Sequence, residues 1–122
     1  MPRCADMTNI AYSFSNGAHI LLVEGHSGYA KCGRDIVCAG VSTLVQALVK
    51  ALRDLGEHVS LDIETDASRA SYHITAKAED KYISYVNGAF DVALCGFKLL
   101  SSAYPENVNI NVNFNSIVEN MG

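Results

Sequence analysis

The apolar residues of this chain follow two different spacings, and the order in which these spacings succeed one another strongly limits the fold. From about Asn9 to Ser15 every second residue is large and apolar, which is typical of a half-buried strand. A second strand-like run covers His19–Glu24, and the Asn16-Gly17 dipeptide between the runs favours a type I′ turn. We therefore predict a β-hairpin whose second strand is covered on both faces or nearly so.

The spacing then changes to that of an amphipathic helix. Between Val37 and Leu55 apolar residues recur three and four positions apart, and Gly56 stands where a left-handed C-terminal cap is preferred. A second helix is predicted from about Glu79 to Ala103 and is ended by Tyr104-Pro105. Its predicted buried stripe comprises Ile83, Val86, Phe90, Leu94 and Phe97, and Gly88 and Gly96 are expected to allow close packing on a neighbour.

Strand spacing returns before and after this second helix. Val59–Glu64 and Ser71–Ala76 alternate around turn residues at 66–68, and their polar faces indicate a sheet with one side open to solvent. Asn107–Phe114 alternates asparagine with apolar residues, which suits a sheet edge or a dimer surface. The order is ββαββαβ. We therefore predict a single α+β domain over residues 1–122, with two helices packed on one mainly antiparallel sheet of about five strands.

Composition excludes several classes of protein. The chain of 122 residues, 49% hydrophobic and 18% charged, is that of an ordinary soluble globular domain. A net charge of −4 argues against nucleic acid as a partner, and no apolar run reaches the ~20 residues of a membrane span. The N-terminal MPRCADMTN does not resemble a signal peptide, so we expect a cytoplasmic protein with reduced thiols. We expect no metal site, because no cysteines form a Cys-x-x-Cys pair and no histidine lies at zinc-finger spacing from them. The thiols are those of Cys4, Cys32, Cys38 and Cys95.

Reactive residue types concentrate between Gly25 and Ser42, where the second strand leads into the first helix. We expect Asp35 to be the N-cap of that helix, which places Cys38 in its first turn. The positive end of the helix dipole favours a thiolate there, and Ser42 lies one turn further along the same edge. His26 leaves the end of the strand, so its imidazole can reach Cys38 if strand and helix pack side by side.

A cysteine and a histidine in this arrangement suit nucleophilic catalysis. The histidine would form an ion pair with the thiolate and later protonate a leaving amine, while free N–H groups at the helix start would stabilise an oxyanion. Gly28 and Gly33 would let the intervening loop move for a substrate. The alternative is a packed structural cysteine, because cysteine is among the most buried residue types. We expect His19 to be structural or solvent-facing and Cys95 to lie in the core.

The same stretch resembles the ribosomal-processing cysteine protease (Prp) family. The residues that carry the resemblance are Gly25-His26, Gly28-Tyr29-Ala30, Gly33, Asp35–Ala39 and Val41-Ser42. It implies that Cys38 is the nucleophile and His26 the general base and acid, without metal or cofactor. It also implies supporting positions at Gly25, Asp35 and Ser42 and a substrate loop at Gly28, Tyr29 and Gly33. Two residues depart from the family pattern, since Ser27 and Gly40 stand where alanine is usual.

Family members are cytoplasmic homodimeric peptidases that remove an N-terminal extension from a large-subunit ribosomal protein, and related prophage proteins trim capsid or scaffold proteins. The resemblance therefore implies a protein substrate and a homodimer, with neither nucleic acid nor membrane as a partner. Two other functions fit the same residues. One is a non-catalytic module that binds the ribosome or another partner, and the other is a cysteine hydrolase of small amides or esters.

Overall fold

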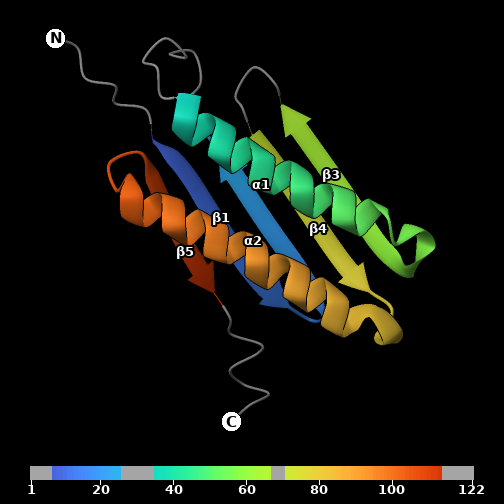
Figure 1. Cartoon of the computed structure of the whole chain (residues 1–122). Helices are drawn as coiled ribbons and strands as arrows, with labels where there is room; N and C mark the ends of the chain where they lie inside the picture. The colour runs from blue at the N-terminus through green and yellow to red at the C-terminus, as the bar shows by residue number, and fades with distance from the viewer. Residues whose placement is uncertain (1–6, 26–34, 67–70, 114–122) are drawn as a thin grey trace, which may run out of the picture.

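The computed structural model describes residues 7–25, 35–66 and 71–113, and in these segments two helices cover one face of a five-stranded sheet (Figure 1). The predicted α+β class and the order ββαββαβ are confirmed. The strands and main helices are β1 (Thr8–Ser15), β2 (Ala18–Glu24), α1 (Asp35–Arg53), β3 (Val59–Asp66), β4 (Ser71–Ala78), α2 (Ile83–Ala103) and β5 (Val108–Asn113). Short 3₁₀ turns, η2 (Gly56–His58) and η4 (Asp80–Tyr82), precede β3 and α2.

The strands lie in the order β3-β4-β2-β1-β5. Neighbours are antiparallel except for β1 and β5, which pair in parallel with Thr8 opposite Val108. The sheet is therefore mixed rather than antiparallel throughout, because α2 carries the chain back to the end of the sheet at which β1 starts (Figure 1). The asparagine-rich β5 is an edge strand, as its alternation predicts.

Local turn chemistry follows the sequence closely. Asn16 and Gly17 both have positive φ angles, 55° and 79°, as a type I′ turn requires. Gly56 also has a positive φ angle, 60°, just beyond the end of α1. Glycine adopts this conformation without the steric cost that a Cβ would bring, so the predicted helix stop is confirmed.

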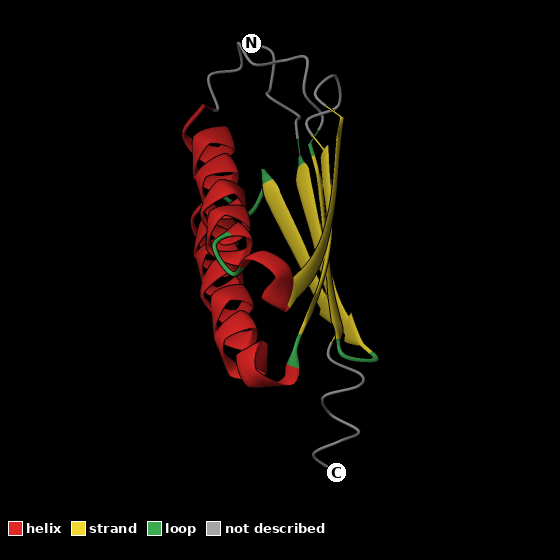
Figure 2. Cartoon of the chain, turned by 90° about the vertical axis from the view of Figure 1, so that its right-hand side faces the viewer, coloured by secondary structure: helices red, strands yellow, loops and turns green. Residues whose placement is uncertain are grey.

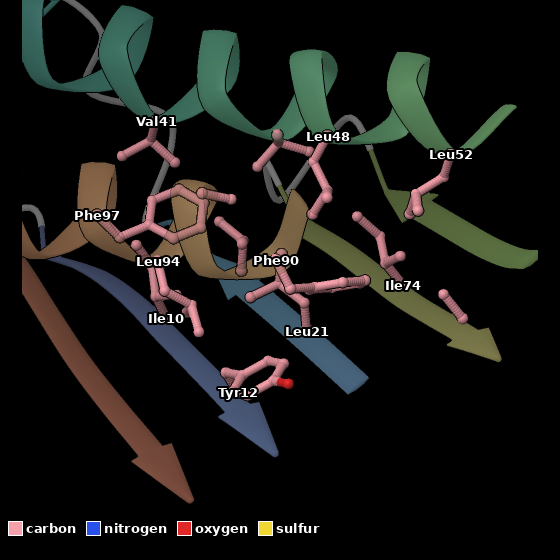
Figure 3. Close-up of a cluster of buried hydrophobic side chains, with 14 of the residues drawn as sticks. Ile10, Tyr12, Leu21, Val41, Leu48, Leu52, Ile74, Phe90, Leu94 and Phe97 are labelled. Carbon is pink, nitrogen blue, oxygen red and sulfur yellow. The ribbon is translucent and has the colours of Figure 1, made fainter. Parts of the chain in front are cut away.

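The core lies between the helices and one face of the sheet (Figure 3). Leu21 and Val23 of β2 point into it and are almost fully buried. Ile20 and Leu22 point to the opposite face and are only partly buried. The expectation that β2 is covered on both faces is therefore wrong, because both helices lie on the same side of the sheet (Figure 2).

The predicted stripe of α2 is confirmed except at its first position. Val86, Phe90, Leu94 and Phe97 are buried, whereas Ile83 is 42% exposed. Ile83 is the first residue of α2 and directly follows the 3₁₀ turn η4. Of the two glycines in α2, Gly96 does pack closely, since an added Cβ would lie 2.7 Å from both methyl carbons of Leu44. Gly88 has no such neighbour within 4 Å.

His19, a buried residue of β2, is hydrogen-bonded to both β1 and α2. The hydroxyl of Tyr12 donates to Nδ1 of His19 at 2.6 Å, and Nε2 of His19 donates to Oδ1 of Asn87 at 2.9 Å. The ring of His19 stacks on Phe90 with centroids 4.3 Å apart. These contacts use the neutral imidazole with its proton on Nε2. Burial lowers the pKa of His19, against the smaller opposing effects of Asn87 and Asp91.

The depressed pKa of His19 predicts a loss of stability in mild acid. Since the folded state holds this imidazole neutral, its contribution is complete above the unfolded pKa of about 6.5 and is lost as the pH falls through the lower folded pKa. Protonation of one group limits the slope to about 1.4 kcal/mol per pH unit. Urea unfolding between pH 8 and pH 5 will measure it. His19→Gln should flatten the profile, whereas the matched change His73→Gln on the exposed sheet face should not.

Candidate active site

Strand β2 and helix α1 bring the two ends of the glycine-rich stretch to the same end of the molecule. β2 finishes at Glu24, Gly25 follows it, and α1 begins at Asp35 beside the same edge (Figure 1). The connecting residues 26–34 lie outside the described residues. The predicted positions of His26, Gly28, Tyr29 and Gly33 are therefore not described, and neither is the side chain of Asp35.

Helix α1 places Cys38 in its first turn, where the side chain is exposed. Asp35 is the first described residue of α1, and both its side chain and the residue before it lie outside the described part of the chain. Its role as the N-cap therefore stays a prediction. Cys38 remains beside the positive end of the helix dipole. An exposed cysteine at this point contradicts the alternative in which it is a packed core residue.

Ser42 lies one helical turn beyond Cys38 on the same flank of α1. Its Oγ accepts a hydrogen bond of 3.3 Å from Nε2 of Gln46, which lies one further turn along. Cys38, Ser42 and Gln46 are thus spaced at four-residue intervals along an unbroken helix. They form a polar flank, which we call the Cys38 flank.

The Cys38 flank leads into a groove of about 410 Å³ between α1 and the β3–β4 hairpin. Its residues are mainly apolar on the inside and cationic at one end, and they are Val45, Gln46, Val49, Lys50, Arg53, Ile63, Thr65 and Tyr72. The groove starts at Val45, seven residues after Cys38, or roughly 11 Å along the helix axis. An extended peptide covers that distance with about three residues. The groove is therefore within reach of a peptide held at Cys38.

Sequence reasoning did not identify this groove. Its only sequence signals are Val49, which widens the apolar stripe of the first helix, and Tyr72, which begins the alternation of a strand. Neither signal says that a helix and the outer hairpin leave a space between them. That space depends on how α1 crosses β3 and β4, which only the tertiary structure defines.

Gly40 lies on the other side of α1, where that helix meets α2. A Cβ added at Gly40 would lie 3.2 Å from both methyl carbons of Leu100. Gly40 is two positions after Cys38, so its direction is turned by about 200° around the helix axis. The departure from the usual alanine is therefore part of the contact between α1 and α2 and does not belong to the Cys38 flank.

The remaining cysteine and histidine predictions have mixed outcomes. Cys95 is exposed, so the expectation that it lies in the core is wrong. The reason is its position on α2, which turns Cys95 away from the sheet while Leu94 faces it. His58 lies 3.1 Å from Glu79, and His73 is exposed on the open sheet face. No group of three or more His, Cys, Asp or Glu side chains among the described residues could hold a metal ion.

Comparison with known proteins identifies one family. The family model described as cysteine protease Prp matches residues 7–109. A comparison with curated proteins gave no match. Among solved structures, SMU.848 from Streptococcus mutans is 28% identical, has a TM-score of 0.70, and is matched over 88% of this chain and 95% of its own.

Two further structures show the same fold. The ribosomal processing protease Prp from S. aureus in complex with a substrate peptide is 22% identical, with a TM-score of 0.69. The same protease with a covalently linked product peptide is 23% identical, with a TM-score of 0.68. Each match covers 87% of this chain and 99% of the other chain.

The position of Gly40 predicts that it affects stability more than chemistry. Gly40→Leu should lower the free energy of unfolding by about 1–3 kcal/mol, because the larger side chain must displace Leu100. Gly40→Ala should change it by less than about 1 kcal/mol, since the gain in helix propensity opposes the tight contact. Thermal and urea unfolding will measure both, with the exposed neighbour changed in Ala39→Leu as control. A loss of stability in Ala39→Leu equal to that in Gly40→Leu would contradict the assigned contact.

Proposed function

The chain belongs to the cysteine protease Prp family and is a cysteine protease, and we propose that it is an endopeptidase in which Cys38 is the nucleophile and His26 the general base and acid. The observation that carries the proposal is the exposed Cys38 in the first turn of α1, at the end of the molecule where β2 finishes. His26 follows the last described residue of that segment, Gly25. The C-terminal end of β2 and the first turn of α1, which holds the thiol, therefore lie at the same end of the molecule.

The proposed reaction has two stages. The Cys38 thiolate, favoured near a helix N-terminus, attacks the substrate carbonyl while backbone N–H groups stabilise the oxyanion. The tetrahedral intermediate collapses to a thioester as His26 donates its proton to the leaving amine. His26 then takes a proton from water, whose oxygen attacks the thioester and releases the new carboxylate and Cys38. No metal or cofactor enters these steps.

The other residues of the stretch support this chemistry in the proposal. Gly25 and Asp35 bound the segment that carries His26, and Ser42 extends the polar flank behind Cys38. Gly28, Tyr29 and Gly33 would form the loop that closes over the substrate. The hydrogen bond from Gln46 to Ser42 orients the Ser42 hydroxyl along the Cys38 flank.

The proposed substrate is the N-terminal extension of a large-subunit ribosomal protein. The S. aureus relative that shares this fold is a ribosomal processing protease and was crystallised with a substrate peptide. In this chain the groove between α1 and the β3–β4 hairpin offers apolar walls and the ring of Tyr72. Such walls suit aromatic residues near a cleavage site. A phage capsid or scaffold protein would be the second substrate class.

The proposal also includes the cellular location and the oligomeric state of the protein. We place the protein in the cytoplasm, where thiols stay reduced and ribosomal proteins are made. We also propose that it acts as a homodimer of single protease domains. Neither proposal requires a nucleic-acid or membrane partner.

Cleavage of a ribosomal-protein N-terminal peptide tests the dyad directly. Cys38→Ala and His26→Ala should each lower kcat/KM by at least about 1,000-fold, because either loss removes the nucleophile or its proton carrier. Cys4→Ala, which removes a different thiol, should cleave normally. Rapid cleavage by Cys38→Ala would refute the mechanism. Tight peptide binding without turnover by the wild type would favour the non-catalytic module, and turnover of small esters alone would favour the other hydrolase.

The proposed substrate groove predicts a separate effect. Tyr72→Ala should lower kcat/KM for a peptide with aromatic residues before the cut by about tenfold, mainly through KM, because the ring is lost from the groove wall. The matched variant is His73→Ala, whose side chain lies on the opposite face of the same strand. Circular dichroism must show both variants folded. Equal kinetics for Tyr72→Ala and wild type would place substrate binding elsewhere.

A further inference from the structure

An exposed apolar stripe runs the length of α2 on the side that faces away from the sheet. Tyr85, Val92 and Leu99 are 52%, 70% and 72% exposed. They are seven residues apart, which brings them to the same side of a helix. Exposed large apolar residues are ordinary when scattered, but a continuous line of them marks an interaction surface.

Small residues fill the positions between these three. Gly88 and Cys95 lie three or four residues from their large neighbours, and Cys95 is exposed. A Cβ placed on Gly88 would meet no atom within 4 Å, so the helix surface is hollow there. The five residues Tyr85, Gly88, Val92, Cys95 and Leu99 form a heptad pattern that we call the α2 seam.

An apolar groove borders the α2 seam. It has a volume of about 530 Å³, lies between α1 and α2, and is lined mainly by small or aliphatic side chains such as Leu44, Ala47 and Ala51. Gly88 and Val92 of the α2 seam form part of its opposite wall. The outer surface of the helical layer is thus a ridge beside a hollow, both apolar.

Only two residues of α2 are charged, and they have opposite signs. Asp91 and Lys98 are both exposed and are also seven residues apart, so they lie along one edge of the α2 seam. Neither takes part in an ion pair with another described side chain of the chain. In a two-fold antiparallel pairing of α2 with a second copy, each Asp91 comes next to Lys98 of the partner subunit.

We propose that the α2 seam is the homodimer interface, with the two α2 helices packed antiparallel across a two-fold axis. In this register Leu99 enters the hollow at Gly88 of the partner subunit, and Val92 meets Cys95 of the partner subunit. Each contact occurs twice, as an isologous interface requires. A parallel pairing would instead place the two Asp91 side chains on opposite sides of the interface, and neither would lie beside Lys98 of the partner subunit. The proposal rests on the homodimer named under the proposed function and assigns its surface.

A second copy accounts for features that a lipid surface does not. By length and composition alone both helices are apolar enough to cross a membrane. However, contact with lipid does not explain why Asp91 and Lys98 lie one heptad apart. It also does not explain why the hollow at Gly88 matches a large side chain in size. Mutual pairing uses both features. Membrane binding therefore becomes an alternative outcome of the experiment.

Charge exchange tests the interface and its orientation together. The wild type should sediment as a dimer, and Asp91→Lys or Lys98→Asp should each weaken dimerisation by about tenfold, since each creates two like-charge contacts. Combining Asp91→Lys with Lys98→Asp should restore the wild-type dissociation constant. Leu99→Glu should yield monomer over the same concentrations. Lys77→Asp, on the open sheet face, should leave the dimer unchanged.

Thiol cross-linking tests the register. In a background of Cys4→Ala, Cys32→Ala and Cys38→Ala, the variant Val92→Cys should form an intermolecular disulfide with Cys95 when oxidised by copper phenanthroline. Tyr85→Cys is the matched control, because it would lie about two helical turns from Cys95 of the partner subunit and should cross-link at least tenfold more slowly. Equal cross-linking of the two variants would overturn the antiparallel register.

The outcomes separate this inference from the peptidase proposal. A dimer that survives Leu99→Glu would overturn the α2 seam while leaving the homodimer in place. A wild type that is monomeric at every concentration would overturn both, and its flotation with phosphatidylglycerol vesicles would assign the seam to lipid. Peptide cleavage measured on the same samples reports on Cys38 and His26 independently of these results.

Discussion

The burial of two helices on one face of the sheet is the constraint on which the rest of the molecule depends. Because α1 and α2 share that face, each helix has one side against the sheet, one side against the other helix, and the remaining surface exposed (Figure 2). The exposed surface of α1 carries Cys38. That of α2 carries the apolar seam. The two activities proposed for this protein, peptide hydrolysis and self-association, therefore use different helices and do not compete for surface.

The two helices can approach each other closely because each has a glycine at the contact. Gly40 of α1 admits Leu100, and Gly96 of α2 admits Leu44, so each helix receives a leucine from the other. This reciprocal contact fixes the rotation of α1 about its axis. With Gly40 turned towards α2, Cys38 must turn towards the β3–β4 hairpin and its groove. Gly40, which does not belong to the Cys38 flank, thus decides the direction in which Cys38 points.

Most of the fold could be predicted because periodicity and turn residues are local properties of the sequence. The hairpin at Asn16-Gly17 and the end of α1 near Gly56 followed from backbone preference alone. Cys95 and Ile20 were misjudged because spacing shows which residues share a face but not what covers that face. The parallel pairing of β1 with β5 depends on contacts distant in sequence, which no local pattern records.

The candidate site was predictable in part for the same reason. Helical phase alone puts Cys38 and Ser42 on one flank, and the structure agrees. The roles predicted for His26, Asp35 and the loop glycines stay predictions, because residues 26–34 and the side chain of Asp35 lie outside the described part of the chain. The groove between α1 and the β3–β4 hairpin and the α2 seam could not be foreseen. Both depend on which apolar side chains remain exposed after the helices have packed.

The edge position of β5 has a consequence for how the protein is made. Asn109 donates a hydrogen bond of 3.3 Å to Asn9 across 100 residues of sequence, and β5 pairs with β1 along its length. The hairpins and α1 involve partners much closer in sequence, so they become available earlier as the chain leaves the ribosome. Until β5 arrives, β1 has an open edge. The sheet therefore stays incomplete until β5 has been synthesised.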